Sequence, residues 1–496
     1  MLIKKRLDDL PWFHVILPLV FFLVEASIIV FYEHFEFDPD EGINLIKAFL
    51  VYQDHQLFQD VWSDQPPLLT NLLVFLFKIL TPSVDLARGL ILVFSAVLLW
   101  QIWLILYLLG GVLHAYIGCF FLLISHHYLR LSVSVMIGLP SLTLALGAFL
   151  SVILWHVYRR NIWLVISALL LCLSAATKMF TLFLAPIIFL GIAIDGILNQ
   201  RQSSWTKKIR HSIIWSAAFI VIGAILLLSQ VGIENIHFLV GGHASARDLD
   251  YFQGITLGKV IKNDYRIFII GLTIWGTIIA FKRQQWQVLY FTAWSASSFF
   301  LLINHRPVWY HHAMLLTIPT VVMVGYTLGE IITTGINPKN SFLRFKKART
   351  LTVFTIVVLL ATMLLVGERT RTTLKEIDYW LITDNKAESI SGVAPQFLAE
   401  ITRLKPQTDW IVTDSPIFAF RAGLSVPPST AVLSQKQLRT GNITEAKVLD
   451  VINTYQPQQI FFRRFPWEEL TKSIQSDYQL IKQDENSRLY VRKSEE

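Results

Sequence analysis

The chain has 496 residues, of which 54% are hydrophobic and only 16% are charged. A soluble domain carries about 25% charged residues, so this composition excludes a soluble globular fold for most of the chain. The formal net charge of +8 raises nucleic acid as a partner, but the Lys and Arg residues lie mainly in short loops between apolar runs, which indicates membrane topology instead.

The N-terminal segment predicts a membrane anchor. Lys4, Lys5 and Arg6 precede an apolar run at 12–32. The run is long enough to cross a bilayer and lacks a small-residue cleavage site, so we do not expect a cleaved signal peptide. The basic residues place the N-terminus in the cytoplasm.

Further apolar runs follow along the chain. Runs long enough to cross lie at 87–108, 138–157, 179–198, 212–230, 265–281, 286–303, 310–332 and 350–366, and shorter runs lie at 67–80, 111–125 and 162–177. A crossing helix needs about 20 residues, so the short runs are the uncertain ones. The alternation of the basic loops requires that one of the early short runs does not cross, and we expect this to be the 67–80 run, which begins at a Pro-Pro pair and is half-inserted or re-entrant. This predicts about 11 crossings, or about 13 if the short runs also cross.

Basic loops fix the expected orientation. The loops at 159–160, 201–210, 282–283 and 339–349 are rich in Lys and Arg and are predicted to be cytoplasmic. The acidic loop 33–66, the loop 231–264 and everything from 367 onward then lie outside. We therefore expect a multi-pass protein of the plasma (inner) membrane.

The last part of the chain changes character. Strand-like runs at 410–412, 460–462 and 489–491 alternate with helical patterns at 393–403 and 444–454. This alternation predicts a small α/β domain. The expected division is a membrane domain at 1–366 and an extracytoplasmic domain at 367–496.

The loop 33–66 is the region richest in groups that could carry chemistry. Asp38, Asp40 and Glu41 lead into an amphipathic run at 43–50, which places Asp40 near a helix N-terminus, and Asp64 stands where the chain re-enters the membrane. The acidic bias alone would fit a solvated loop. Carboxylates at a membrane boundary are costly, however, and a desolvated Asp can act as a general base.

Other polar groups occupy predicted outer turns. Lys178 lies between two apolar runs, where it is either a snorkelling anchor or a phosphate ligand. His243 and Arg247 lie in a glycine-rich loop that could wrap an anionic group. Arg306 and Tyr310 belong to a dense polar turn, for which interfacial anchoring is the alternative.

Several motifs are absent from the sequence. It contains no P-loop, no Rossmann glycine fingerprint, no HExxH and no GxSxG. We expect no nucleotide cofactor, so an activated substrate must come from another source. Cys119 and Cys172 lie inside apolar runs and predict no disulfide framework.

The order of these features resembles the GT-C superfamily of polyprenyl-phosphate-sugar glycosyltransferases. The features are an outer loop with Asp-Glu, a Pro-Pro re-entry, a Thr-Lys turn, a His-to-Arg loop and a Tyr-bearing turn before a late Pro. The nearest branch is similar to protein O-mannosyltransferases and to the lipid A aminoarabinose transferase. The resemblance implies an all-α polytopic membrane domain with a small C-terminal α/β domain outside the membrane.

The resemblance also implies roles for residues in the early motifs. Asp40, followed by Glu41, matches the catalytic Asp-Glu pair of the first loop. Lys178 matches the turn that contacts the lipid phosphate. Asp64 stands one residue away from the acid that helps to hold a metal.

The later motifs match less closely. His243 and Arg247 resemble residues that serve phosphate or metal, and Arg306 with Tyr310 matches the late outer turn. A divalent cation held by Asp64 and His243 is thus one expectation. The chain departs from the family because the turn at 126–137 has no acid and the Lys turn lacks its usual Gly-Pro.

The predicted function is transfer of a sugar from a polyprenyl-phosphate-linked donor to a hydroxyl of a lipid, glycan or protein at the outer face. Asp40 is the expected general base in an inverting reaction, and Lys178, Arg247 and Arg306 would stabilise the leaving phosphate. A transporter or lipid flippase is the main alternative and predicts charges near the bilayer midplane. A scaffold that presents the tail would tolerate loss of these charges. Membrane lipids are expected partners and nucleic acid is not.

Overall fold

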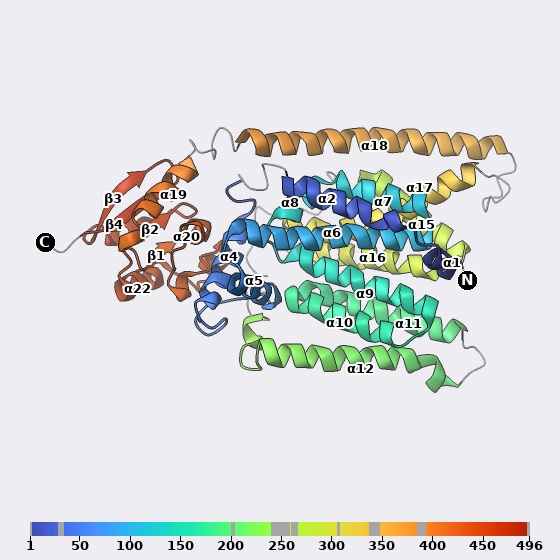
Figure 1. Ribbon diagram of the computed structural model, residues 1–496, viewed down its shortest axis with the longest axis horizontal. Coiled ribbons are helices and arrows are strands. Elements are labelled where there is room, and N and C mark those ends of the chain that lie inside the picture. The colour runs from blue at the N-terminus through green and yellow to red at the C-terminus, as the bar shows by residue number, and fades with distance from the viewer. Residues whose placement is uncertain are drawn as a thin grey trace.

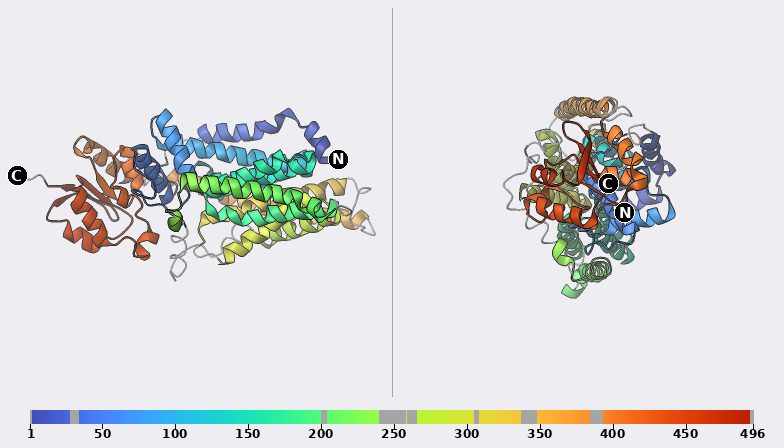
Figure 2. Two further views of the ribbon diagram at one scale, coloured as in Figure 1. Left: turned by 90° about the horizontal axis from the view of Figure 1, so that it is seen from below. Right: turned by 90° about the vertical axis from the view of Figure 1, so that its left-hand side faces the viewer.

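The computed structural model describes residues 2–27, 34–199, 204–239, 258, 266–304, 308–336, 348–383 and 393–493. A bundle of helices forms the larger part, and a smaller domain with a sheet lies beyond one end of the bundle (Figure 1). The N-terminal helix lies at the opposite end of the long axis from the C-terminal domain (Figure 2). Arg247, Arg306 and His243 lie outside the described residues.

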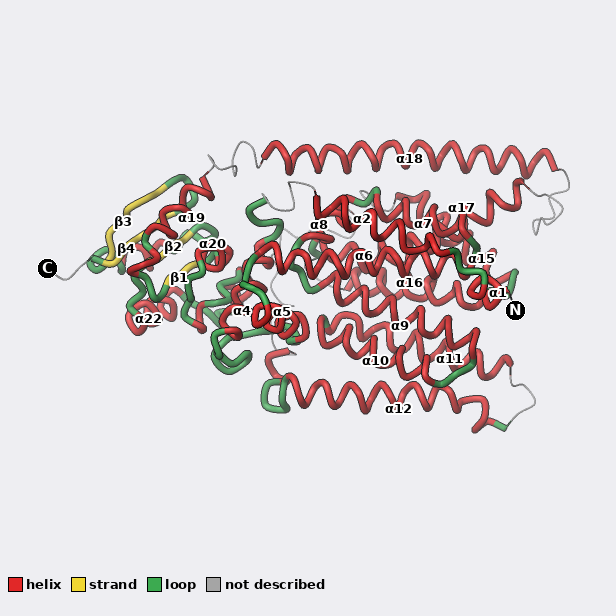
Figure 3. The backbone as a smooth tube through the Cα atoms, viewed as in Figure 1, coloured by secondary structure: helices red, strands yellow, loops and turns green. Residues whose placement is uncertain are grey.

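Most of the bundle helices run roughly along the long axis (Figure 3). They are α1 (Leu2–Asp8), α2 (Ile16–Ser27), α6 (Val84–Leu109), α7 (Val112–Leu123), α8 (His126–Val133), α9 (Gly138–Tyr158), α10 (Ile162–Thr177), α11 (Ala185–Asn199), α12 (Trp205–Gln230), α15 (Arg266–Lys282), α16 (Leu289–Asn304), α17 (Met314–Ile336) and α18 (Ala348–Thr383). Short 3₁₀ segments precede α11 and α17, at Met179–Leu184 and Tyr310–Ala313.

Within the described residues, six helical segments are long and apolar enough to cross a membrane. The number is seven if α7 and α8, which are bent by 75° at their junction, form one broken span. Four shorter apolar helices accompany them, at Trp12–Ser27, Leu68–Ile79, Ile162–Thr177 and Phe268–Lys282. The predicted fold class, a polytopic helical membrane domain with a small C-terminal α/β domain, is confirmed.

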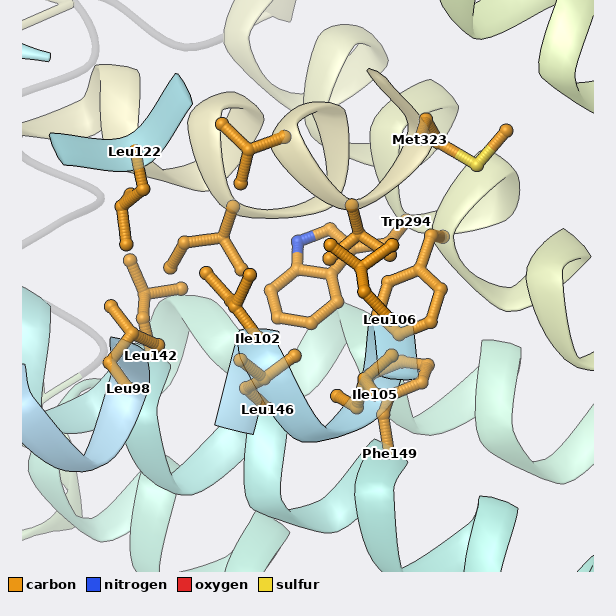
Figure 4. Close-up of a cluster of buried hydrophobic side chains, with 14 of the residues drawn as sticks. Leu98, Ile102, Ile105, Leu106, Leu122, Leu142, Leu146, Phe149, Trp294 and Met323 are labelled. Carbon is orange, nitrogen blue, oxygen red and sulfur yellow. The ribbon is translucent and has the colours of Figure 1, made fainter. Parts of the chain in front are cut away.

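The centre of the bundle is a close-packed apolar core. Figure 4 shows α6 side chains interleaved with those of its neighbours: Leu98, Ile102, Ile105 and Leu106 of α6, Leu122 of α7, Leu142, Leu146 and Phe149 of α9, Trp294 of α16 and Met323 of α17. The α6 residues recur every three or four positions, so they share one helix face. Because lipid is as apolar as these side chains, close packing holds the helices together.

Burial separates central helices from peripheral ones. In the most apolar window of each helix, 94% of the α17 segment is buried, against 11% of the α12 segment. Exposed apolar residues on α12, such as Ile220 and Val221, fit a lipid-facing edge.

Two shorter helices, α4 (Pro39–Tyr52) and α5 (Leu68–Ile79), lie at the end of the bundle next to the C-terminal domain (Figure 1). The 12 residues of α5 rise about 18 Å, which is less than the thickness of a bilayer core. This length agrees with the expectation that the 67–80 run does not cross.

The C-terminal domain contains a four-stranded mixed sheet of order β1-β2-β4-β3. Its elements are α19 (Val393–Arg403), β1 (Ile411–Thr413), α20 (Pro416–Ala422), α21 (Gln435–Arg439), α22 (Glu445–Tyr455), β2 (Gln459–Phe462), α23 (Glu468–Ser473), β3 (Tyr478–Gln483) and β4 (Arg488–Arg492). β1 and β2 pair in parallel, and the other pairs are antiparallel. The helix α18 continues past the predicted domain boundary at 366/367 and ends at Thr383.

The C-terminal domain docks directly on α4 through α20. Gly42 permits the approach, because a Cβ at this position would lie 2.7 Å from the backbone nitrogen of Ile417. The rings of Phe49 and Phe420 meet edge to face with centroids 5.7 Å apart. Both parts therefore share one hydrophobic core, and this contact positions the C-terminal domain over the acidic loop.

Candidate active site

A polar cavity of about 340 Å³ lies where the acidic loop, the turns at 178–180 and 309–312, and the C-terminal domain meet. Its lining includes Asp38, Asp40, Lys47, Asp64, Lys178, Tyr310, Lys436 and Arg464. Four of the eight predicted site residues, Asp40, Asp64, Lys178 and Tyr310, thus face one space. Their elements are far apart in sequence, so the fold brings them together.

Asp40 is positioned by the first turn of α4. Pro39 occupies the first helical position, and the Asp38 side chain caps the helix by accepting a 2.9 Å hydrogen bond from the Asp40 backbone nitrogen. The other Asp38 oxygen accepts a 2.6 Å hydrogen bond from the Tyr310 hydroxyl. Asp38 therefore connects the start of α4 to the turn that carries Tyr310, and the Asp40 side chain stays exposed to the cavity.

The surroundings of Asp40 favour a base that works near neutral pH. The side chain faces open space, but protein encloses that space. Burial, followed by repulsion from Asp38, raises the pKa of Asp40 to about 6, while Arg464 and Lys178 oppose the rise. A pKa near the operating pH is the usual setting for a general base.

Glu41 has a structural environment instead of a catalytic one. Its carboxylate is fully buried and forms two hydrogen bonds with Arg88, from Nε at 2.9 Å and from an η-nitrogen at 2.8 Å. The backbone nitrogens of Phe37 and Val135 also donate to it. Burial alone would raise the pKa of Glu41, but Arg88 and these hydrogen bonds lower it overall. The expectation that Glu41 shares the catalytic role does not fit, because its side chain points into the bundle and does not line the cavity.

Two lysines line the cavity together with Asp40. Lys178 ends α10 and lines the membrane side of the cavity, and burial lowers its pKa to about 8, against the attraction of Asp40 and Asp64. Lys47 lies on α4 and is 4% exposed. Burial also lowers its pKa. Lys47 was not predicted as a site residue.

Asp64, one of the two predicted metal ligands, is paired with a cation of the C-terminal domain. One Asp64 oxygen accepts a 2.7 Å hydrogen bond from the Lys436 ammonium group of the C-terminal domain. Across the described parts of the chain, no group of three or more His, Cys, Asp or Glu side chains could hold a metal ion. His243, the other predicted metal ligand, lies outside the described residues. We therefore assign no step to a metal.

Tyr310 contacts protein groups on both sides. Its hydroxyl binds Asp38, and the Arg130 guanidinium lies over its ring at 4.4 Å from the centroid. Arg130 also donates to the Phe37 carbonyl. These contacts give Tyr310 a place in the cavity wall and tie it to the loop that carries Asp40.

An apolar groove of about 1150 Å³ lies beside the polar cavity, between α11 and α16. Both helices line it along their length, from Phe180 and Asn304 near the cavity to His156 and Asp195 at the other end. Phe180 lines both the groove and the cavity. The groove therefore leads along the bundle to the residues around Asp40.

The described helices and the cavity define a polytopic helical membrane protein with a polar cavity at one end of its bundle. The chain is similar to the crystal structure of ArnT from Cupriavidus metallidurans bound to undecaprenyl phosphate, at 11% identity, 96% coverage of this chain, 98% coverage of that chain and a TM-score of 0.57. The apo state of the same protein gives a TM-score of 0.58. The GT-C resemblance predicted from the sequence is thus confirmed for the fold.

Two further solved structures have the same general fold. The oligosaccharyltransferase from Archaeoglobus fulgidus, in complex with Zn and sulfate, has 11% identity and a TM-score of 0.50, with 86% of this chain and 64% of that chain covered. The arabinofuranosyltransferase AftD from Mycobacteria has 12% identity and a TM-score of 0.50, with 96% and 40% covered. No protein-family model and no curated protein matches the sequence.

Proposed function

We propose that the protein transfers a sugar from a polyprenyl-phosphate donor to a hydroxyl acceptor at the outer face of the membrane. The main support for this proposal is that two features lie side by side. Asp40 and Lys178 line one polar cavity, and the apolar groove meets that cavity at Phe180. A lipid-linked sugar phosphate has the same order of parts, a long apolar tail, an anionic group and a polar sugar.

The chemistry follows from these positions. Asp40 takes the proton of the acceptor hydroxyl, whose oxygen attacks the anomeric carbon as the bond to the lipid phosphate breaks. The single displacement inverts the anomeric configuration. The lipid monophosphate leaves as an anion, so it needs nearby cations more than an acid, and Lys178 and Lys47 provide two. Arg247 and Arg306 keep their proposed roles as further phosphate ligands.

The alternative of a transporter receives less support. A transporter that moves its cargo by alternating access places its binding groups near the middle of the membrane. Here the polar cavity lies at the end of the bundle, beside α4 and the C-terminal domain. This position suits a reaction between a lipid-anchored donor and an acceptor that arrives from outside.

The proposal is tested by an in vitro transfer assay with the purified full-length protein and a panel of labelled polyprenyl-phosphate sugars. We expect release of free polyprenyl phosphate and transfer of label to an acceptor fraction or, more slowly, to water. If neither release nor transfer occurs with any donor, and undecaprenyl phosphate does not bind, the proposed function is wrong.

We expect the pH profile of kcat/KM to be bell-shaped. The rate should fall below a pH of about 6, where Asp40 gains a proton, and above a pH of about 8, where Lys178 loses its positive charge. The charged groups facing Asp40 include Asp38, Asp64 and Arg464. The Lys178→Arg variant should lose the alkaline limb and keep the acidic one, because arginine stays charged to a pH of about 12.

A matched control for this profile is Lys78→Arg, since Lys78 is exposed at the end of α5 and lines neither the groove nor the cavity. This variant should leave both limbs in place. An alkaline limb that persists in Lys178→Arg would belong to another group and would contradict the assignment.

We expect Ala296→Trp to obstruct the apolar groove, which Ala296 lines from α16. The KM for a donor with a full-length polyprenyl chain should rise about tenfold or more, while a donor with a ten-carbon chain should be affected much less, because only the long chain needs the whole groove. Leu228→Trp on the exposed face of α12 is the control. Equal effects on both donors would place the lipid tail elsewhere.

A further inference from the structure

One buried carboxylate holds the loop that follows β2 in the C-terminal domain. Asp414 is fully buried directly after β1. It accepts hydrogen bonds from the backbone nitrogens of Arg463, Arg464 and Phe465 at 2.8, 3.0 and 3.0 Å, and from the Trp467 indole nitrogen at 2.8 Å. Four hydrogen bonds to one carboxyl group hold the backbone of this loop in place.

The fixed loop presents Arg464 to the polar cavity. Arg464 lines the cavity together with Asp40, whereas the neighbouring Arg463 does not line it. The contacts of the Arg464 guanidinium are weak: a 3.4 Å hydrogen bond to the Asp414 carbonyl oxygen and a position 5.7 Å from the Phe465 ring centroid. Within the described part of the chain, Arg464 forms no salt bridge.

Lys436, the other cation that the C-terminal domain contributes, differs in this respect. Its ammonium group is paired with Asp64 at 2.7 Å, so its charge is already balanced. Arg464 carries a planar guanidinium that can bind two oxygens of a phosphate or carboxylate at once. A preorganised arginine without a salt bridge, facing a cavity, is a feature expected of an anion-binding wall.

The position of Arg464 separates it from the donor phosphate site. Lys178 lines the membrane side of the cavity, next to Phe180 and the apolar groove, and Arg464 lines the side made by the C-terminal domain. Both charges act on Asp40, which they favour in its ionised form. In an inverting displacement the acceptor attacks the sugar on the face opposite to the one from which the phosphate leaves, so two cations on different walls suit two different anionic groups.

We propose that Arg464 binds a second anionic group, a phosphate or carboxylate carried by the acceptor substrate. The inference rests on the proposed function for the assignment of the donor to the Lys178 side. It adds a substrate class: an acceptor with an anionic group within reach of the hydroxyl that receives the sugar. It also gives the C-terminal domain a part in substrate selection.

Two binding measurements on the full-length protein test this inference. Undecaprenyl phosphate binding is measured first, and inorganic phosphate binding is then measured with and without saturating undecaprenyl phosphate. Intrinsic fluorescence serves as the signal, because Trp62 and Trp309 line the cavity. We expect wild-type protein to bind inorganic phosphate even when the lipid phosphate site is full.

The variants should separate the two sites. Arg464→Gln should weaken inorganic phosphate binding about tenfold or more and leave undecaprenyl phosphate affinity unchanged, which corresponds to the loss of a charge-assisted contact. Lys178→Met should weaken undecaprenyl phosphate binding and leave the inorganic phosphate affinity of the Arg464 site unchanged. Arg464→Lys should be intermediate, since it keeps the charge and loses the planar fork. Arg463→Gln, in the same loop, should match the wild type in both measurements.

Two outcomes would overturn the inference. Equal phosphate affinity in Arg464→Gln and wild type would exclude an anion site at Arg464. A loss of undecaprenyl phosphate affinity in Arg464→Gln would assign the residue to the donor. Failure of the wild type to bind undecaprenyl phosphate would instead count against the proposed function, while the inorganic phosphate measurement would still decide the role of Arg464.

Discussion

We expect Asp40→Asn to lower the turnover number by about 10²–10⁴-fold, the range usual for loss of a general base. The amide has nearly the same shape as the carboxylate but does not take a proton from the acceptor. Because the Asp40 side chain faces the cavity and its backbone nitrogen makes the capping hydrogen bond, the helix start should be unchanged. Single-turnover release of polyprenyl phosphate measures the effect on the chemical step.

Undecaprenyl phosphate binding supplies the internal control for this variant. Its affinity should be unchanged or higher in Asp40→Asn, since a negative charge near the phosphate has been removed. Asp54→Asn is the matched control in the same loop: Asp54 is exposed and has a φ of 71°, a left-handed conformation that Asn tolerates. Near-wild-type turnover in Asp40→Asn would mean that another group acts as the base.

We expect Arg88→Met to destabilise the protein by about 3–5 kcal/mol, the effect usual when one partner of a buried ion pair is removed. Arg88 and Glu41 are both fully buried, so the variant leaves the Glu41 carboxylate without its main counter-charge. Arg88 also donates a 2.8 Å hydrogen bond to the His34 carbonyl, and that bond would be lost too. The midpoint of thermal denaturation of the purified protein measures the change.

A second substitution distinguishes lost charge balance from lost packing. Glu41→Gln combined with Arg88→Met removes the uncompensated charge, so it should recover part of the lost stability. Arg160→Met, at an exposed position after α9, should have little effect. If the double variant is no more stable than Arg88→Met alone, the ion pair is not the origin of the effect.

Much of the fold could be predicted because its signals are local. Each apolar run identified in the sequence became a helix where the structure describes it, and the strands near 411, 460 and 489 follow short apolar runs. β3 was missed because it is mostly exposed and has no such run. α20 has only seven residues, too few for a clear helical period.

Some site residues could be predicted from the local sequence, and others depend on the tertiary fold. Asp40 was predicted from the turn that precedes it. The positions of Lys47 and Glu41 relative to Asp40 follow from helix geometry. Lys47 lies seven residues after Asp40, two turns along the same face, whereas Glu41 lies about 100° around the helix and points into the bundle. Lys436 and Arg464 carried no local signal, because only the docking of the C-terminal domain brings them to the cavity.

The docking of α20 on α4 has a consequence for how the protein is made. Lys436 and its partner Asp64 are 372 positions apart in the chain. At roughly 5–20 residues per second, a ribosome needs roughly 20–75 s to synthesise the segment between them. During that time α4 lacks the C-terminal domain that completes its cavity, including two of the four cations that line it in the described part of the chain. Synthesis of α4 therefore precedes completion of the cavity, and a nascent chain that stalls before residue 464 leaves the polar cavity without Arg464.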